Sequence, residues 1–373
     1  MTSYKNQVLQ IVPHIQALPA IVPFVAPDAL ERGRGRAFRA RLGANESGFG
    51  PSPKVLAALQ YATAEVWKYG DPENHELKAA IARHHGVSPS NIVVGEGIDG
   101  LLGVAARLTL APGATAVTTD GGYPTFNYHV AANGGKLVKV PYRQDREDLE
   151  GLLDAARRYN PAALFVSNPN SPMGTWWGAS EIGCFIAELP PRVLLLLDEA
   201  YADTAPVETL PILKLDNPQI LRLRTFSKAY GLAGARVGYA LGESGLIQEF
   251  NKIRNHYGVN RIAQAAAVAA VADQAYLAEA VARIRTAKER LIRIALDNGL
   301  EPLPSGTNFV TMDCGHDGAF AQALMDSLIG RDVFLRKPSG APQDRCIRVS
   351  CGPDADIDVF AEELPGALTT LRA

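Results

Sequence analysis

Apolar residues recur along the chain at two characteristic spacings. In residues 54–66 and 76–85 they stand three and four positions apart, which places them on one face of a helix. Between such segments lie short apolar runs that predict strands: residues 91–94, 115–118, 137–140, 163–167, 193–197 and 220–224. Alternating helices and strands predict an α/β fold, with a mainly parallel sheet sandwiched by helices.

The run Leu194–Leu197 predicts a central strand of this sheet. It consists of leucines without polar alternation, which is typical of a strand buried on both faces. Asp198 and Glu199 follow it directly. Because ligands bind at the carboxyl ends of the strands in such sheets, we expect the functional site at this edge.

The pattern divides the chain into three parts. Residues 1–40 are rich in proline and then basic, which predicts an arm that lies on another surface. Residues 41–262 form the large domain with the parallel sheet. Residues 263–373 predict a smaller C-terminal α+β domain, with a long helix over 274–297 and strand-like runs at 308–312, 333–335 and 346–350.

Composition removes several classes of function. Lysine and arginine number 37 against 39 aspartates and glutamates, so no excess charge attracts nucleic acid or an anionic membrane. Four cysteines without a CxxC pair predict reduced thiols, no metal site and a cytoplasmic protein. Prolines interrupt the N-terminal segment, and no 18 apolar residues run together, so we expect neither an export signal nor a membrane span.

The segment Thr225–Arg236 is the most informative one for chemistry. Lys228 follows a predicted strand, and a lysine amine becomes nucleophilic when burial or a nearby cation lowers its pKa. Ser227 and Arg236 provide a hydroxyl donor and a fixed cation, which together suit a phosphate group. A lysine without such surroundings is usually an ordinary surface residue, but these surroundings favour a reactive one.

Asp198 is a second residue that, together with Lys228, indicates a cofactor. A carboxylate at the end of a buried strand is costly without a cation beside it, and the protonated nitrogen of a pyridine ring supplies one. A carboxylate that keeps this nitrogen charged makes the ring an electron sink for a substrate carbanion. Lys228 and Asp198 therefore predict the cofactor pyridoxal 5'-phosphate, held by an imine bond to the lysine.

Two nucleotide-binding sites are the alternatives to this interpretation. The leucine run with Asp198 resembles the metal-binding strand of a P-loop ATPase, but the chain contains no GxxxxGK[ST]. Residues 95–100 match GxGxxG, and Asp120 follows, as in a NAD-dependent dehydrogenase. Free amides at a helix N-terminus bind any phosphate, however. A nicotinamide enzyme also gives no reason for Asp198, Lys228 and Arg236.

Six segments resemble the fold-type I aminotransferases, most closely the histidinol-phosphate aminotransferase branch. In chain order they are residues 43–51 (GANESGFGP), 69–72 (YGDP), 167–174 (SNPNSPMG), 198–201 (DEAY), the Lys228 segment and 346–350 (CIRVS). They span almost the whole chain, and several segments in order are more specific than any one of them. A pyridoxal-phosphate protein without turnover is the alternative from another class, but no basic DNA-binding segment of a regulator is present.

The resemblance implies a role for each matching residue. Lys228 is the imine lysine and the base that moves the α-proton, Asp198 pairs with the ring nitrogen, and Asn170 and Tyr201 hydrogen-bond the phenolic oxygen. Tyr69 reaches the phosphate from a neighbouring subunit, which requires a homodimer with shared active sites. The other residues implied at the phosphate are Gly97, Ile98, Asp99, Thr225, Ser227 and Arg236.

The resemblance also implies which residues contact the cofactor ring and the substrate, and which substrates are expected. Phe126 stacks on the cofactor ring, Arg348 binds a substrate carboxylate with its guanidinium fork, and the Asn45 loop lines the substrate pocket. The partners implied are an amino donor such as glutamate and a keto acceptor. Imidazole-acetol phosphate, which yields histidinol phosphate, is the expected acceptor; an aromatic keto acid and threonine-phosphate decarboxylation are the alternatives. Ser171 departs from the family, where many members carry a second Asn before the proline.

Overall fold

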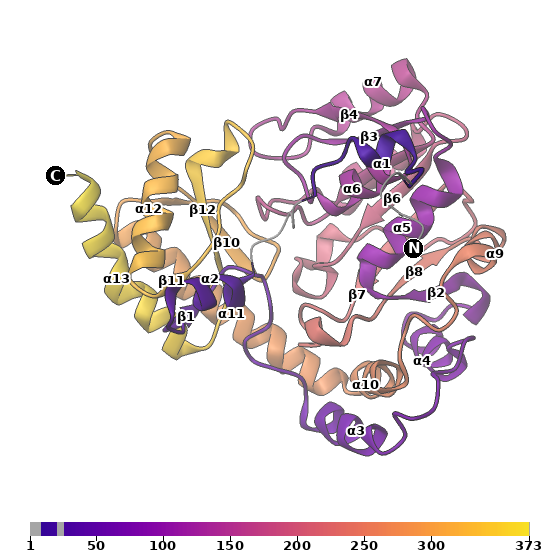
Figure 1. Ribbon diagram of the computed structural model, residues 1–373, viewed down its shortest axis with the longest axis horizontal. Coiled ribbons are helices and arrows are strands. Elements are labelled where there is room, and N and C mark those ends of the chain that lie inside the picture. The colour runs from indigo at the N-terminus through magenta and orange to yellow at the C-terminus, as the bar shows by residue number, and fades with distance from the viewer. Residues whose placement is uncertain (1–8, 21–25, 373) are drawn as a thin grey trace, which may run out of the picture.

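The computed structural model describes residues 9–20 and 26–372. Its largest sheet has seven strands in the order β2-β8-β7-β6-β5-β3-β4 (Figure 1). β8 is antiparallel to both its neighbours and all other pairs are parallel, so the predicted mainly parallel sheet is confirmed. The strands are β2 (Ile92–Gly95), β3 (Thr115–Thr119), β4 (Lys136–Val140), β5 (Ala163–Ser167), β6 (Leu194–Asp198), β7 (Ile220–Thr225) and β8 (Gly238–Gly242).

Side chains of the central strands alternate between two apolar cores. Leu194 and Leu196 of β6 pack in one core, and Leu195 and Leu197 pack in the other. The first core is closed by α5 (Gly97–Thr109), α6 (Thr125–Ala132) and α9 (Ser244–Ile253). The opposite face is covered by α7 (Leu149–Tyr159) and α8 (Ala179–Ala187), and, beside β2 and β8, by α3 (Pro53–Thr63), α4 (His75–His85) and α10 (Arg261–Ala272). Both faces are thus buried under helices, as parallel sheets require.

The C-terminal elements enclose a separate core, drawn in orange and yellow in Figure 1. A three-stranded antiparallel sheet in the order β12-β10-β9 lies in this part. Its elements are α11 (Gln274–Asp297), β9 (Glu301–Pro302), β10 (Phe309–Asp313), α12 (Gly318–Gly330), β11 (Val333–Phe334), β12 (Cys346–Ser350) and α13 (Asp354–Arg372). A short strand from near the N-terminus, β1 (Ala40–Arg41), pairs with β11. The smaller α+β part is therefore completed by an early segment of the chain.

α10 and α11 meet at an angle of 82°. Asp273 lies at this bend and forms an ion pair with Lys54 at 2.9 Å. In the described part of the chain no single helix has the length and apolar character of a membrane span, and only these two bent helices reach that length and composition together. α10 packs on α3 and α4, whereas α11 contacts β9, β10 and α13. The chain thus passes from one core to the other at this bend.

Most predicted elements lie within a few residues of those observed. The helix predicted over 274–297 is α11, and Gly299, just beyond it, has φ 75°, the left-handed conformation that ends helices. β8 is not predicted, because glycines border a run of only three residues, Tyr239–Leu241. The domain limits at 40/41 and 262/263 stay predictions. Short 3-10 turns are η1 (Pro89–Asn91), η2 (Ala202–Thr204), η3 (Val207–Thr209), η4 (Ala233–Ala235) and η5 (Gln343–Arg345).

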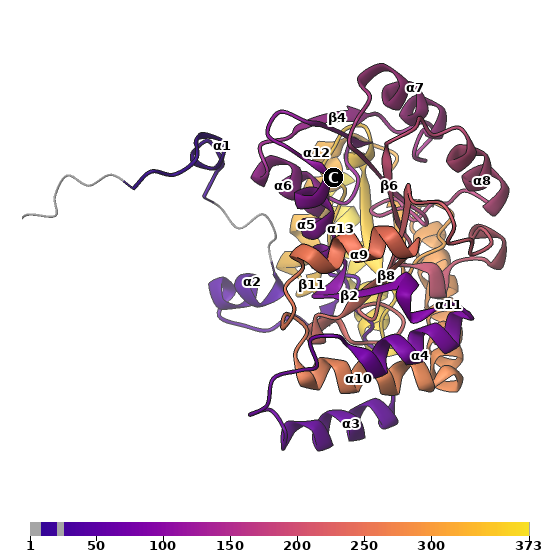
Figure 2. The ribbon, with the colours of Figure 1, turned by 90° about the vertical axis from the view of Figure 1, so that its right-hand side faces the viewer.

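The predicted N-terminal arm falls partly outside the described residues. Within it, α1 (Pro13–Gln16) contacts α6, and α2 (Pro27–Arg34) follows closer to the C-terminal elements. Figure 2 shows α1 projecting from one side of the molecule. Leu9, Ile11 and Val12 are exposed there, so the apolar side chains of this segment are not covered by the chain itself.

Candidate active site

The carboxyl ends of β5, β6 and β7 bring the predicted residues to one edge of the sheet. Asp198 ends β6 and is the register partner of Ser167 on one side and Leu223 on the other. Lys228 lies three residues after the end of β7. This is the edge at which open α/β sheets bind ligands, as the sequence predicts.

Lys228 and Tyr201 are joined through Asn45. The Lys228 amino group donates to the Asn45 carbonyl at 3.3 Å and lies 5.5 Å from the centre of the Tyr201 ring. Asn45 Nδ2 donates to the Tyr201 hydroxyl oxygen at 3.0 Å, and Ser350 Oγ of β12 donates to Asn45 Oδ1 at 3.0 Å. The Tyr201 hydroxyl therefore keeps its own proton for another acceptor, and both cores of the molecule contribute to the site.

Asp198 is a buried carboxylate without a counter-ion in the described residues. One oxygen accepts a hydrogen bond from the Ala200 amide at 2.9 Å, and no lysine or arginine there lies within ion-pair distance. Burial, together with the nearby charge of Asp99, raises the pKa of Asp198 to about 7 against the weaker effects of the Ala200 amide and Lys228. A carboxyl group in this state is poised to accept a cationic partner.

The start of α5 and the segment after β7 form an anion cradle. Gly97 begins α5 with φ 73°, and a Cβ atom there would lie 2.6 Å from Arg236 Nη2. Only glycine lets the guanidinium approach the helix N-terminus this closely. Arg236 Nη1 lies 3.5 Å from Ser227 Oγ, and Thr225 Oγ1 accepts from the Ser227 amide at 3.0 Å. These groups fit the predicted phosphate site.

Asp99 and Ile98 lie in the first turn of α5. Asp99 accepts a hydrogen bond from the Tyr123 hydroxyl at 3.1 Å and lies 3.9 Å from Arg236. Phe126 is fully buried, and its ring stacks on Phe165 at 5.3 Å. The structure thus brings Asp99 close to Arg236 and places the Phe126 ring in the core against Phe165.

Asn170 and Tyr69 occupy different surroundings from the residues above. The Asn170 amide lies in a buried hydrogen-bond cluster with Glu147, Ser167 and Tyr142. The Tyr69 side chain is 80% exposed and its ring contacts Tyr257 at 5.1 Å. The described contacts of the Tyr69 ring are thus with Tyr257, and none with the Gly97–Arg236 cradle is seen among the described residues.

Arg348 and Arg336 form a cationic pair on the C-terminal sheet. Their backbones exchange hydrogen bonds of 2.7 and 3.4 Å, which places both side chains on the same face. Burial, together with the Arg336 charge, lowers the pKa of Arg348 to about 10. Among the described residues Arg348 has no carboxylate partner, and its Nε has no acceptor.

Sequence reasoning missed Arg336, Glu147, Tyr142 and Ser350. The pairing of residues 336 and 348 depends on a bridge outside regular strands, so spacing could not predict it. Glu147 lies two residues before α7, and no local pattern marks its carboxyl group as buried.

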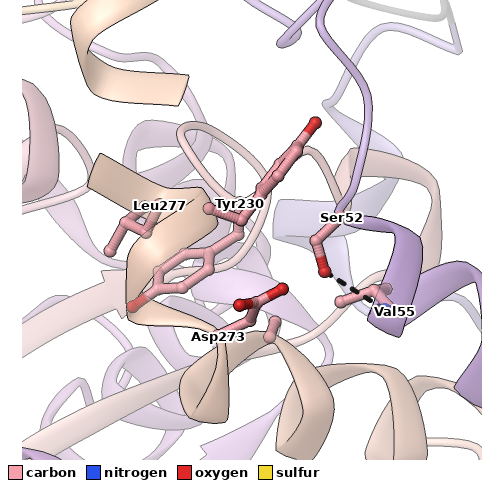
Figure 3. Close-up of a pocket in the computed structure, with 7 residues that line it drawn as sticks. Ser52, Val55, Tyr230, Asp273 and Leu277 are labelled. Atoms are coloured by element: carbon pink, nitrogen blue, oxygen red, sulfur yellow. Dashed lines mark hydrogen bonds between the residues drawn. The ribbon is translucent and has the colours of Figure 1, made fainter. Parts of the chain in front are cut away.

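Two pockets lie away from this edge. One, beside the α10–α11 bend, is lined by Ser52, Tyr230 and Asp273 among others (Figure 3). The other is a wider cleft near the start of α4, with Lys78 and Arg254 in its lining. Neither pocket is lined by Lys228.

The fold and this edge define the class, and comparison with known proteins agrees. The chain belongs to the class I and II aminotransferases, a family that matches residues 40–364. It is 36% identical to histidinol-phosphate aminotransferase 2 of Pseudomonas aeruginosa over 358 residues, 94% of this chain and 96% of the relative. It is 33% identical to histidinol-phosphate aminotransferase of Moorella thermoacetica over 356 residues, 94% of this chain and 91% of the relative.

A solved structure is similar over nearly the whole chain. The crystal structure of histidinol-phosphate aminotransferase from Sinorhizobium meliloti in complex with pyridoxal-5'-phosphate has a TM-score of 0.95 and 54% identity, covering 98% of this chain and 99% of that one. The predicted fold-type I architecture and the transaminase class are confirmed. The family match decides against the ATPase and the dehydrogenase.

Proposed function

We propose that the protein is a pyridoxal-phosphate-dependent aminotransferase. It would transfer an amino group from glutamate to imidazole-acetol phosphate, which yields histidinol phosphate. The single observation that supports the cofactor is the edge of the sheet where Lys228, the Gly97–Arg236 cradle and Asp198 meet. Asp198 is buried there and has no counter-ion among the described residues. The relatives' names support the substrate.

The residues fit the cofactor in three independent ways. Asp198 would hold the proton on the pyridine nitrogen, because a buried carboxylate needs a cation. The cradle of Gly97, Ser227 and Arg236 would hold the phosphate. The Lys228 amine would form the covalent bond. When bound, pyridoxal phosphate supplies an electron sink for negative charge at the substrate α-carbon.

The chain's own groups would then manage the protons. The Lys228 amine would shuttle a proton between the substrate α-carbon and the cofactor. The Tyr201 hydroxyl, whose oxygen accepts from Asn45, would donate its proton to the phenolic oxygen of the cofactor. Asp198 would keep the ring nitrogen protonated. Each task uses an atom whose other hydrogen bonds the structure defines.

The paired arginines support a phosphorylated substrate. Like charges directly opposite each other on a sheet destabilise it, and Arg336 and Arg348 are such a pair. An anion with two negative charges relieves this repulsion better than a single carboxylate does. Two charge-assisted contacts of about 1.5–3 kcal/mol each would favour a phosphorylated substrate by on the order of 10²-fold or more.

We also propose a homodimer in which Tyr69 reaches the partner's phosphate site. Tyr61, Val66, Trp67 and Tyr257 are exposed near Tyr69, and monomers rarely leave a large apolar patch uncovered. A cytoplasmic location is proposed as well, supported by the four free thiols.

The test compares acceptors with glutamate as donor. We expect kcat/KM for imidazole-acetol phosphate to exceed that for an aromatic keto acid, and that for unphosphorylated imidazole-acetol, by on the order of 10²-fold. A preference for the aromatic keto acid would contradict the substrate but leave the transaminase intact. Sedimentation at low concentration tests the dimer, and a persistent monomer with full activity would overturn it.

A further inference from the structure

The Glu147 carboxyl group lies at the centre of a buried cluster beside the proposed active site. Glu147 Oε2 accepts from the Ser167 amide at 3.1 Å, and Oε1 accepts from Asn170 Nδ2 at 2.9 Å. The side chain is buried. In the part of the chain that the structure describes, no lysine or arginine pairs with it. Its partners are neutral donors only.

We propose that Glu147, as a neutral carboxyl group, is a positioning residue for the cofactor site, because it fixes the end of β5 beside Asp198. This inference rests on the proposed function, since the site it supports is the proposed cofactor site. In this proposal Asn170 helps Glu147 to position the end of β5, and Tyr201 is the residue that would hydrogen-bond the phenolic oxygen of the cofactor.

The side chain of Asn170 is fully hydrogen-bonded within the Glu147 cluster. Its Oδ1 accepts from the Tyr142 hydroxyl and from the Met173 amide, both at 3.1 Å. Its Nδ2 donates to Glu147 and, at 3.2 Å, to Ser167 Oγ. An asparagine amide has two hydrogens to donate, and both are used. The side chain is thus locked and has no N–H left for a ligand.

The neutral state of Glu147 follows from its surroundings. Burial raises its pKa to about 8 in spite of its hydrogen bonds. The titratable groups around the cluster are Tyr142 after β4, Asp120 after β3 and Asp145 in the same loop, where Arg345 pairs with Asp145 at 2.8 Å. The Thr119 hydroxyl at the end of β3 is a further hydrogen-bonding neighbour of Glu147, and a hydroxyl oxygen can accept the carboxyl proton.

The cluster connects directly to Asp198. Ser167, which both Glu147 oxygens contact, is the register partner of Asp198. The Asn168 amide donates to the Asp198 carbonyl at 2.9 Å. A shift of the β5 end would therefore move the carboxylate that holds the ring nitrogen. Such a shift would change the pH at which the lysine–cofactor bond titrates, which a purely structural residue would leave alone.

The first test uses cofactor-free protein and is independent of activity. The folded state keeps the Glu147 proton up to about pH 8, so its contribution to stability is present at low pH and is lost as pH rises from about 4.5 to 8. Glu147→Gln keeps the shape and cannot ionise. We expect the urea midpoint of Glu147→Gln, relative to wild type, to rise steadily between pH 5 and pH 8. Glu150→Gln, at an exposed neighbour, is the matched control and should show no such trend.

The second test uses the absorbance band of the cofactor bound to Lys228. We expect Glu147→Ala and Asn170→Ala to shift the pH midpoint of this band by about one unit, the effect of one misplaced hydrogen bond. The double variant should shift it no further, because both residues act through one cluster, whereas the control Glu150→Gln should retain the wild-type midpoint. Unchanged midpoints in both alanine variants, or additive shifts, would overturn the proposal. Absence of the band in wild type would instead refute the proposed function.

Discussion

Asp198 and Glu199 are consecutive buried carboxylates at the end of β6, and their surroundings are opposite. Glu199 pairs with Arg222 at 2.6 Å and with Arg224 at 2.7 Å. Burial alone would raise its pKa, but the two guanidinium groups lower it below the usual value. Asp198 has one amide donor and no counter-ion in the described chain, and burial raises its pKa to about 7.

The difference separates structure from chemistry. A buried charge that is fully paired has no unsatisfied interaction to offer a ligand. Removing one member of such an ion pair leaves its partner buried without a counter-charge, which lowers the free energy of unfolding. A buried charge without a partner is expensive unless something else supplies the partner. Glu199 thus belongs to the scaffold and Asp198 to the site. The same contrast exists between two arginines. Arg222 is paired, whereas Arg348 has no carboxylate partner in the described chain.

Removing the paired carboxylate should have the largest effect on stability. Glu199→Ala leaves Arg222 and Arg224 buried without a counter-charge, so we expect the free energy of unfolding to fall by about 3–5 kcal/mol. Urea unfolding of the cofactor-free protein measures it. A loss below about 1 kcal/mol would show that the buried pairing contributes little.

Removing the Asp198 carboxylate should instead affect catalysis. Asp198→Asn removes the group that we propose to keep the ring nitrogen charged, and we expect kcat to fall by on the order of 10²–10³-fold. At pH 5 the cofactor-free variant should be at least as stable as wild type, because no charge partner is lost. A variant that is unstable yet fully active would reverse the assignment of the two residues.

The dependence of stability on pH sharpens the comparison. Folded Asp198 keeps its proton to about pH 7, so its contribution to stability is lost as pH rises from about 4 to 7. We expect cofactor-free Asp198→Asn to gain about 2–3 kcal/mol relative to wild type between pH 5 and pH 7. Glu199→Gln should show no such gain between pH 5 and pH 7, because the pKa of Glu199 is lowered from 4.5 and its contribution to stability is lost only as pH falls below that value. Identical trends for the two variants would contradict the account.

The smallest expected effect concerns substrate affinity. Arg336→Gln removes one of the two cations opposite each other, and we expect KM for the phosphorylated acceptor to rise about tenfold at nearly constant kcat. The unphosphorylated acceptor is the control and should change little. An equal rise for both acceptors would show that Arg336 does not contact the phosphate group.

Local pattern explains which parts of this molecule were predictable. The leucine run of β6, buried on both faces, and the stop at Gly299 are encoded by neighbouring residues, and both were predicted. The meeting of Lys228, Asp198 and Arg236 was predictable because parallel strands deliver their carboxyl ends to one edge. Arg336 and Glu147 were not, because their roles depend on contacts between segments far apart in the sequence. β8 was missed because its apolar run is short and bounded by glycines.

The central claim is that Lys228 carries the cofactor at this edge of the sheet. The direct test is to incubate the protein with pyridoxal phosphate, reduce the imine bond with borohydride, digest the chain and locate the added mass. We predict the mass on the peptide that contains Lys228, with none on that peptide in Lys228→Ala. Label on a different lysine, with the Lys228 peptide unmodified in wild type, would contradict the account.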